Sequence, residues 1–78
     1  MVILREITKN NDIIQADYYP EGNSDKGHLA VNISTSETIT HESATGYENS
    51  TVSYHVKKAL FRLASLDEIP KQKTVMWY

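Results

Sequence analysis

The sequence contains no cysteine, and this absence removes several kinds of chemistry at once. Disulfide bonds, cysteine-zinc sites and thiol nucleophiles are excluded within these residues, and a chain without disulfides is typical of a reducing compartment. We therefore expect a cytoplasmic location. Small domains without disulfides or metals often gain stability by association, so a homodimer is one expected form.

Glycine is scarce, and its three copies are spread over residues 22 to 46. A phosphate-binding loop or a dinucleotide-binding turn needs closely spaced glycines, and a serine nucleophile elbow needs the pattern Gly-x-Ser-x-Gly. None of these patterns is present. The sequence therefore predicts no catalytic and no cofactor-binding residues, and it favours a protein that is not an enzyme.

The histidines do not stand at the short spacing that holds a metal ion on a helix. They are His28, His41 and His55. Scattered surface side chains explain all three, so we expect no metal-binding residues.

Long apolar runs are missing as well. Val2, Ile3 and Leu4 are followed at once by Arg5, whereas a membrane helix needs about 20 apolar residues and a signal peptide about 7–15. We therefore expect a soluble protein with no membrane partner.

The net charge of −2 hides an uneven distribution. Residues 1–50 carry three basic and eight acidic side chains, whereas residues 51–78 carry five basic and two acidic ones. The second half of the chain could therefore orient an acidic partner, or the two halves could simply attract each other.

Apolar and polar residues alternate along the first half of the chain, with the period of a half-buried strand. The clearest case is His28 to Ile33. The other predicted strands span residues 2–7 and 12–19, with a turn at 9–12 and a loop at 20–27. Residues 37–42 are a weaker, polar candidate that would suit a sheet edge, and whether they form a strand stays open.

One helix is predicted, from Thr51 to about Leu66, with Ser50 or Asn49 as its cap. An apolar stripe falls at helical spacing and should pack on the sheet. It consists of Val52, Val56, Ala59, Leu60, Leu63 and Leu66. Pro70 prevents any continuation of the helix.

The last residues, Lys73 to Tyr78, are the most apolar and aromatic stretch. An exposed end of this kind would aggregate, so we expect a strand docked beside the first one. Trp77 would either close the core or mark a surface that a partner covers. The direction of this strand stays open.

These elements predict an α+β fold for residues 1–78, taken as a single compact domain. Its sheet of four or five strands would carry a single helix on one face, in the order strand, strand, strand, a weaker strand, helix, strand.

The outer face of the helix is the candidate contact surface. Tyr54 and Phe61 lie seven positions apart, nearly above one another and away from the apolar stripe. Lys57, Lys58 and Arg62 flank them, and no acidic residue occurs between positions 51 and 66. Aromatic and arginine side chains dominate many interfaces, so a protein partner, or a second copy of the chain, is the expected ligand of this face and of Trp77.

Two alternatives to that contact surface stay open. The same basic face could bind nucleic acid, because lysine and arginine neutralise phosphates and aromatic rings stack on bases. Tyr54 and Phe61 could instead pack inside the domain, under the loop at residues 43–49 or against Tyr47 and Ile69.

Three segments resemble a group of small bacterial proteins of unknown activity, often carried on phage or other mobile elements. They are Ile69 to Tyr78, with its Lys-Thr-Val-Met-Trp-Tyr end, Tyr18 to Gly22, and Ala44 to Asn49. The resemblance implies an accessory role in a bacterial cytoplasm and supplies no activity.

Overall fold

The computed structural model describes residues 1–21, 24–44, 46 and 51–76. This part of the chain holds five strands and one helix. They are β1 (Val2–Asn10), β2 (Ile13–Pro20), β3 (Gly27–Asn32), β4 (Thr38–Glu42), α1 (Val52–Ala64) and β5 (Gln72–Val75). The predicted α+β order is confirmed, and the weak candidate before the helix is a strand.

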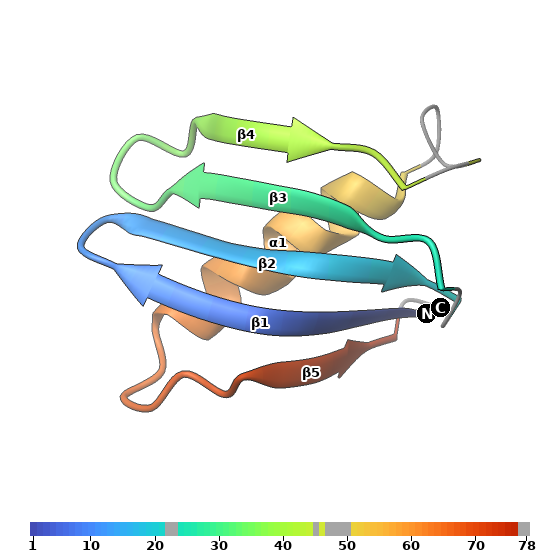
Figure 1. The fold of residues 1–78 in the computed structure, drawn as a ribbon. Coiled ribbons are helices and arrows are strands. Elements are labelled where there is room, and N and C mark those ends of the chain that lie inside the picture. Colours follow the sequence, from blue (N-terminus) through green and yellow to red (C-terminus); the bar gives the residue numbers. More distant parts are fainter. Residues whose placement is uncertain (22–23, 45, 47–50, 77–78) are drawn as a thin grey trace.

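The strands form one antiparallel sheet in the order β4-β3-β2-β1-β5 (Figure 1). The final strand lies beside the first, as predicted, and it runs antiparallel to it, with Val2 opposite Val75. β4 lies at the other edge, and all five of its residues are exposed. The expected positions of Trp77 and Tyr78 fall outside the described residues.

The turn between β1 and β2 follows from its asparagines. Asn11 has a φ of 57°, in the left-handed region that asparagine tolerates better than most residues. The tight turn brings Asn10 opposite Ile13, and the two strands then pair along their length.

A bulge in β1 explains how an irregular apolar pattern fits one core. Val2 and Leu4 face the helix, so strict alternation would turn Ile7 to the opposite face. The register of β1 on β2 shifts between Arg5 and Thr8, and Glu6 takes a φ of 55°. This extra residue returns Ile7 to the inner face, where it is 3% exposed.

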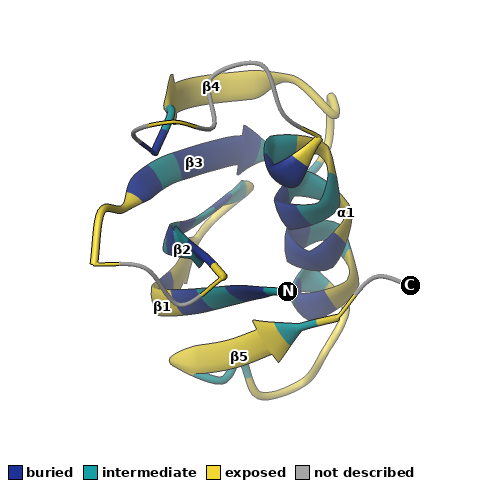
Figure 2. Ribbon diagram, turned by 90° about the vertical axis from the view of Figure 1, so that its right-hand side faces the viewer, coloured by how far each residue is buried: buried dark blue, intermediate teal, exposed yellow. Residues whose placement is uncertain are grey.

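α1 covers one face of the sheet, while β4 and β5 lie at opposite edges (Figure 2). The predicted apolar stripe is buried from Val52 to Leu63. The core beneath it comes from the strands, and the largest fully buried side chains include Tyr18, Leu4, Ile14 and Leu29 from the strands and Leu60 from the helix. Burying such a side chain contributes roughly 1.5–3 kcal/mol each, so this single layer of contacts holds the sheet and the helix together.

Two details of the predicted helix are wrong. Leu66 lies beyond the helix and is 49% exposed, because the helix ends at Ala64 and Ser65 donates both its N–H and its hydroxyl to the Arg62 carbonyl. The N-cap residue is Thr51, whose side chain makes no capping hydrogen bond. The residues proposed as caps, Asn49 and Ser50, lie outside the described residues.

Within the described ranges, the structure has no helix with the length and apolar character that a membrane span requires.

Candidate interaction surface

The side of α1 that faces away from the sheet carries the predicted aromatic and basic side chains. Tyr54 is 59% exposed, and the Nζ atom of Lys58 lies 5.4 Å from the centroid of its ring. A lysine over an aromatic face is attracted by the ring's electron density, so this contact favours a position of the Lys58 side chain near the Tyr54 ring. Arg62 is exposed one turn further along the helix.

Within the described part of the chain, the positive charge on this face has no carboxylate to neutralise it. α1 contains no acidic residue, and among the described residues no carboxylate forms an ion pair with Lys57, Lys58 or Arg62. Unpaired basic side chains around an exposed tyrosine make a surface that favours acidic partners.

Phe61 and Trp77 differ from that cluster. Phe61 is half-buried and packs against the buried core, so the expectation that both helix aromatics are exposed holds for Tyr54 alone. Trp77 lies outside the described residues.

A groove of about 310 Å³ separates α1 from β5. Its lining combines an apolar floor with two basic side chains: Ala59, Arg62, Leu63, Lys73, Thr74, Val75 and Met76. Met76 is 54% exposed. Arg62 thus belongs both to the outer helix face and to the groove, so the two form one continuous surface.

Sequence reasoning missed this groove, although it had singled out both of its walls. Arg62 was assigned to the helix face, and residues 73–78 to a strand beside the first one. Their proximity depends on the register that places Val75 opposite Val2 at the sheet edge, and no local pattern encodes that register.

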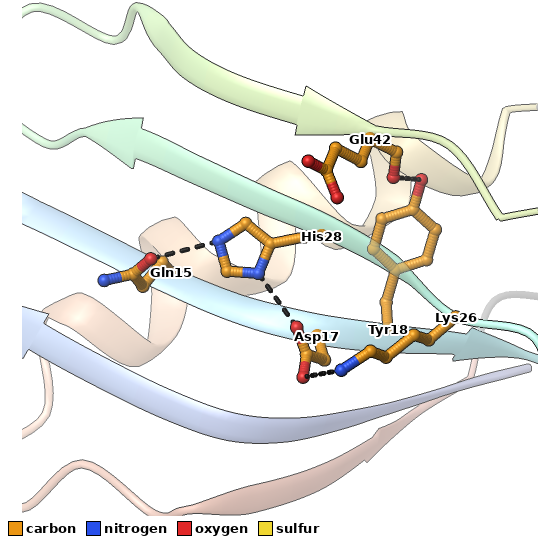
Figure 3. A network of polar contacts seen from close by, with 6 residues as sticks. All are labelled: Gln15, Asp17, Tyr18, Lys26, His28 and Glu42. Carbon is orange, nitrogen blue, oxygen red and sulfur yellow. Dashed lines mark hydrogen bonds and ion pairs between the residues drawn. The ribbon is translucent and has the colours of Figure 1, made fainter.

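The opposite face of the sheet carries a network of polar side chains (Figure 3). His28 on β3 lies between Asp17 and Gln15 on β2, with its Nδ1 2.9 Å from Asp17 Oδ1 and its Nε2 3.0 Å from Gln15 Oε1. Lys26 donates to the other oxygen of Asp17 at 3.0 Å. These contacts cross the strands and tie β3 and its preceding loop to β2.

The Asp17 carboxyl responds to two opposing effects. Partial burial, with the side chain 14% exposed, would raise its pKa. The hydrogen bonds and positive charge from His28 and Lys26 outweigh that burial, so the pKa of Asp17 lies below its ordinary value.

The histidine of this network has little freedom for catalysis. Both ring nitrogens are engaged, one by a carboxylate and one by an amide, whereas a general base needs a nitrogen directed at a nucleophile or substrate. The arrangement therefore serves cross-strand pairing. The sequence had treated His28 as an isolated surface residue. Its pairing with Asp17 becomes visible only from the register, which places the two directly opposite.

A second polar contact lies on the helix side of the sheet. Tyr18 is 1% exposed, and its hydroxyl lies 2.8 Å from Nε2 of His41 and 3.4 Å from the carbonyl oxygen of Glu42. Burial raises the pKa of the Tyr18 hydroxyl, and hydrogen bonds at Ala44 and Ser43 only partly offset the increase. The ring therefore links β2 to β4 as a neutral hydrogen-bonding group.

Neither network forms a metal centre. Among residues 1–21, 24–44, 46 and 51–76, no group of three or more histidine, aspartate or glutamate side chains is arranged to hold an ion.

Compared with known proteins, the chain matches no family model, no curated protein and no solved structure.

Proposed function

We propose that this chain is a small non-catalytic interaction protein that acts by contact with an acidic protein surface. The contact surface consists of Tyr54, Lys57, Lys58 and Arg62, together with the half-buried Phe61. A cytoplasmic accessory role is part of this proposal, because it fits the cysteine-free sequence and the resemblance to mobile-element proteins.

The observation that carries the proposal is that Lys57, Lys58 and Arg62 of α1 form no ion pair with any carboxylate of the described residues. Basic side chains on a small domain usually lie near carboxylates that balance them, and this chain has ten acidic residues from which to draw. None of those in the described part forms an ion pair with the helix. The exposed Tyr54 beside them supplies the aromatic area that interface centres favour.

A second copy of the chain is one possible partner. The first half is acidic and the helix is basic, so a homodimer could place the helix of one copy against the acidic half of the other. Sedimentation equilibrium at low and high salt tests this arrangement. A dimer held by these charges should dissociate as salt increases.

Nucleic acid is the second candidate ligand, and the same unpaired lysines and arginine favour it. Phosphate binding would lose affinity steeply with salt, with a slope that scales with the number of contacts. An acidic protein surface would also bind less tightly as salt increases, but the loss should be shallower, because no condensed counterions are released and Tyr54 contributes apolar contact area.

The deciding experiment is affinity capture from the cell of origin, with and without nuclease, using three forms of the protein. Wild type, Tyr54→Ser/Lys58→Glu and the control Lys9→Glu should be compared, because Lys9 is an exposed lysine of β1 that does not belong to the contact surface. A specific partner should be captured by wild type and Lys9→Glu, retained after nuclease, and lost from the double variant. Capture that disappears with nuclease, or that the double variant retains, contradicts the proposal.

A further inference from the structure

β5 is an edge strand whose outer side is free in the described structure. It pairs with β1 alone, through residues Gln72 to Val75. The carbonyl of Lys71 accepts the N–H of Ile7 at 3.2 Å, and backbone groups along an antiparallel strand point alternately to either side. Lys73 and Val75 therefore bond to β1.

The same alternation turns the N–H and C=O groups of Gln72 and Thr74 toward the free edge. An edge of this kind is a ready template for another strand. β4, the other edge, is exposed as well, but the groove beside a helix is found at β5.

The side chains of β5 alternate in the same way. Lys73 lies opposite Leu4 and Val75 opposite Val2, so both side chains are on the helix side, where they line the groove. A strand added beside β5 would place every second side chain next to them, between β5 and α1.

The chemistry of the groove sets what those added side chains should be. Val75 and Leu63 provide apolar surface, and the exposed thioether of Met76 can adapt to different shapes. Arg62 and Lys73 bring two positive charges, and among the described residues neither forms an ion pair with a carboxylate.

We propose that the groove between α1 and β5 binds an extended acidic segment of a partner protein, which adds to the sheet as an antiparallel strand beside β5. An apolar side chain of the segment lies opposite Val75, and a carboxylate two residues later lies opposite Lys73 and near Arg62. Backbone hydrogen bonds to Gln72 and Thr74 provide affinity, and the apolar-x-acidic spacing provides specificity. This inference rests on the proposed function, whose surface it shares through Arg62.

Lysine on an edge strand also protects a sheet from unwanted pairing. Beside a basic strand, Lys73 would be repelled by the added positive charge. Beside an apolar strand, its ammonium group would lose hydration without gaining a partner. A carboxylate opposite Lys73 avoids both costs. Lys73 therefore disfavours most added strands and selects an acidic one.

The test uses a capped peptide with a threonine background, in which one threonine is replaced by leucine and the threonine two residues later by glutamate. Its control has lysine in place of glutamate. The amides of Gln72 and Thr74 should become protected from hydrogen exchange when the acidic peptide binds, whereas those of Lys73 and Val75, already bonded to β1, should change little. The acidic peptide should bind about tenfold more tightly than the control.

Two charge variants separate the groove from the general charge of the protein. Lys73→Glu should weaken binding of the acidic peptide by about tenfold, while Lys71→Glu, the same change in net charge outside the groove, should alter it less than about twofold. Equal effects of the two variants, or unchanged protection of Gln72 and Thr74 at saturation, would overturn the inference.

Failure of strand addition is distinguishable from failure of the proposed function. If the peptide perturbs only Tyr54, Lys57 and Lys58, the helix face is a contact surface and strand addition at β5 is wrong. If a captured partner is lost from Tyr54→Ser/Lys58→Glu but binds Lys73→Glu normally, the same conclusion follows.

Discussion

The ring of Tyr18 lies directly over Gly27 on the neighbouring strand, and this contact lets one side chain link three strands. Tyr18 belongs to β2 and pairs in register with Gly27 of β3. Because the glycine has no side chain, the ring passes across β3 and its hydroxyl reaches His41 and the Glu42 carbonyl on β4. The exposed edge strand is thereby attached to the buried core.

Replacement of Gly27 by alanine should disrupt this link. A Cβ atom at this position would collide with the Tyr18 ring and lie 2.6 Å from the Glu42 carbonyl oxygen. We expect a loss of about 1–3 kcal/mol in the free energy of unfolding, as for other overpacked sites. Urea denaturation measures it. In a Tyr18→Leu background the cost of Gly27→Ala should be smaller, and an equal cost in both backgrounds would show that the ring does not cause it.

The raised pKa of Tyr18 predicts a loss of stability at alkaline pH. The unfolded chain releases the phenolic proton near pH 10, whereas the folded chain retains it to higher pH. The contribution is therefore complete below about pH 10 and is lost as the pH rises through the folded pKa. Tyr18→Phe should show a shallower loss of urea midpoint above about pH 10 than wild type.

Tyr19→Phe is the matched control, because Tyr19 lies on the opposite face of the sheet, where Arg5 is 5.1 Å from its ring centroid. This variant should keep the alkaline loss of stability. At neutral pH, Tyr18→Phe should also cost about 0.5–1.5 kcal/mol through the lost hydrogen bond to His41. If wild type and Tyr18→Phe change in parallel at alkaline pH, the assignment to Tyr18 is wrong.

The lowered pKa of Asp17 predicts the opposite dependence in acid. The unfolded carboxyl titrates near pH 4, and the folded one at lower pH. Its contribution to stability is present above about pH 4 and is lost as the pH falls through the folded pKa. Asp17→Asn should therefore unfold with a weaker dependence on acid than wild type, measured by urea midpoints across this range. Asp25→Asn, in the adjoining loop, should behave like wild type, and equal behaviour of both variants would contradict the role of the network.

The regular parts of this fold could be predicted because their signals are local. The alternation in His28 to Ile33 and the helical spacing from Val52 to Leu63 each depend on neighbours within a few residues. The first predicts β3 to within one residue at each end, although Ala30 is buried as well, and the second matches the buried face of α1. The end of the helix was placed too far along, since the hydrogen bonds of Ser65 to Arg62 compete with continuation and leave no sequence pattern of their own.

The candidate site was predicted only in part, because much of it depends on contacts between distant segments. Tyr54 and the lysines follow from helix geometry alone. The role of Gly27, which had been read as a loop residue, depends on the residue across from it on β2. The groove depends on the pairing of β5 with β1. The packing of Phe61 against the core is a tertiary contact that the helical spacing of the sequence does not indicate.

Three substitutions on α1 should give graded losses of stability. Leu60 is fully buried, so Leu60→Ala should cost about 2–5 kcal/mol through lost burial and a cavity, enough to unfold much of a small domain. Tyr54 is 59% exposed, so Tyr54→Ser should change stability by about 0.5 kcal/mol or less. Phe61→Ser should fall between them, because its half-buried ring packs against the core.

The same three variants separate folding from binding. Tyr54→Ser should remain folded and lose partner capture or self-association, while Leu60→Ala should lose both together. Chemical denaturation and sedimentation on the same samples provide the comparison. If Tyr54→Ser lowers the unfolding midpoint as much as Leu60→Ala does, Tyr54 is part of the packed domain and not a contact residue. The unpaired charge of Lys57, Lys58 and Arg62 would then have to account for binding alone, and that binding should weaken steeply with salt.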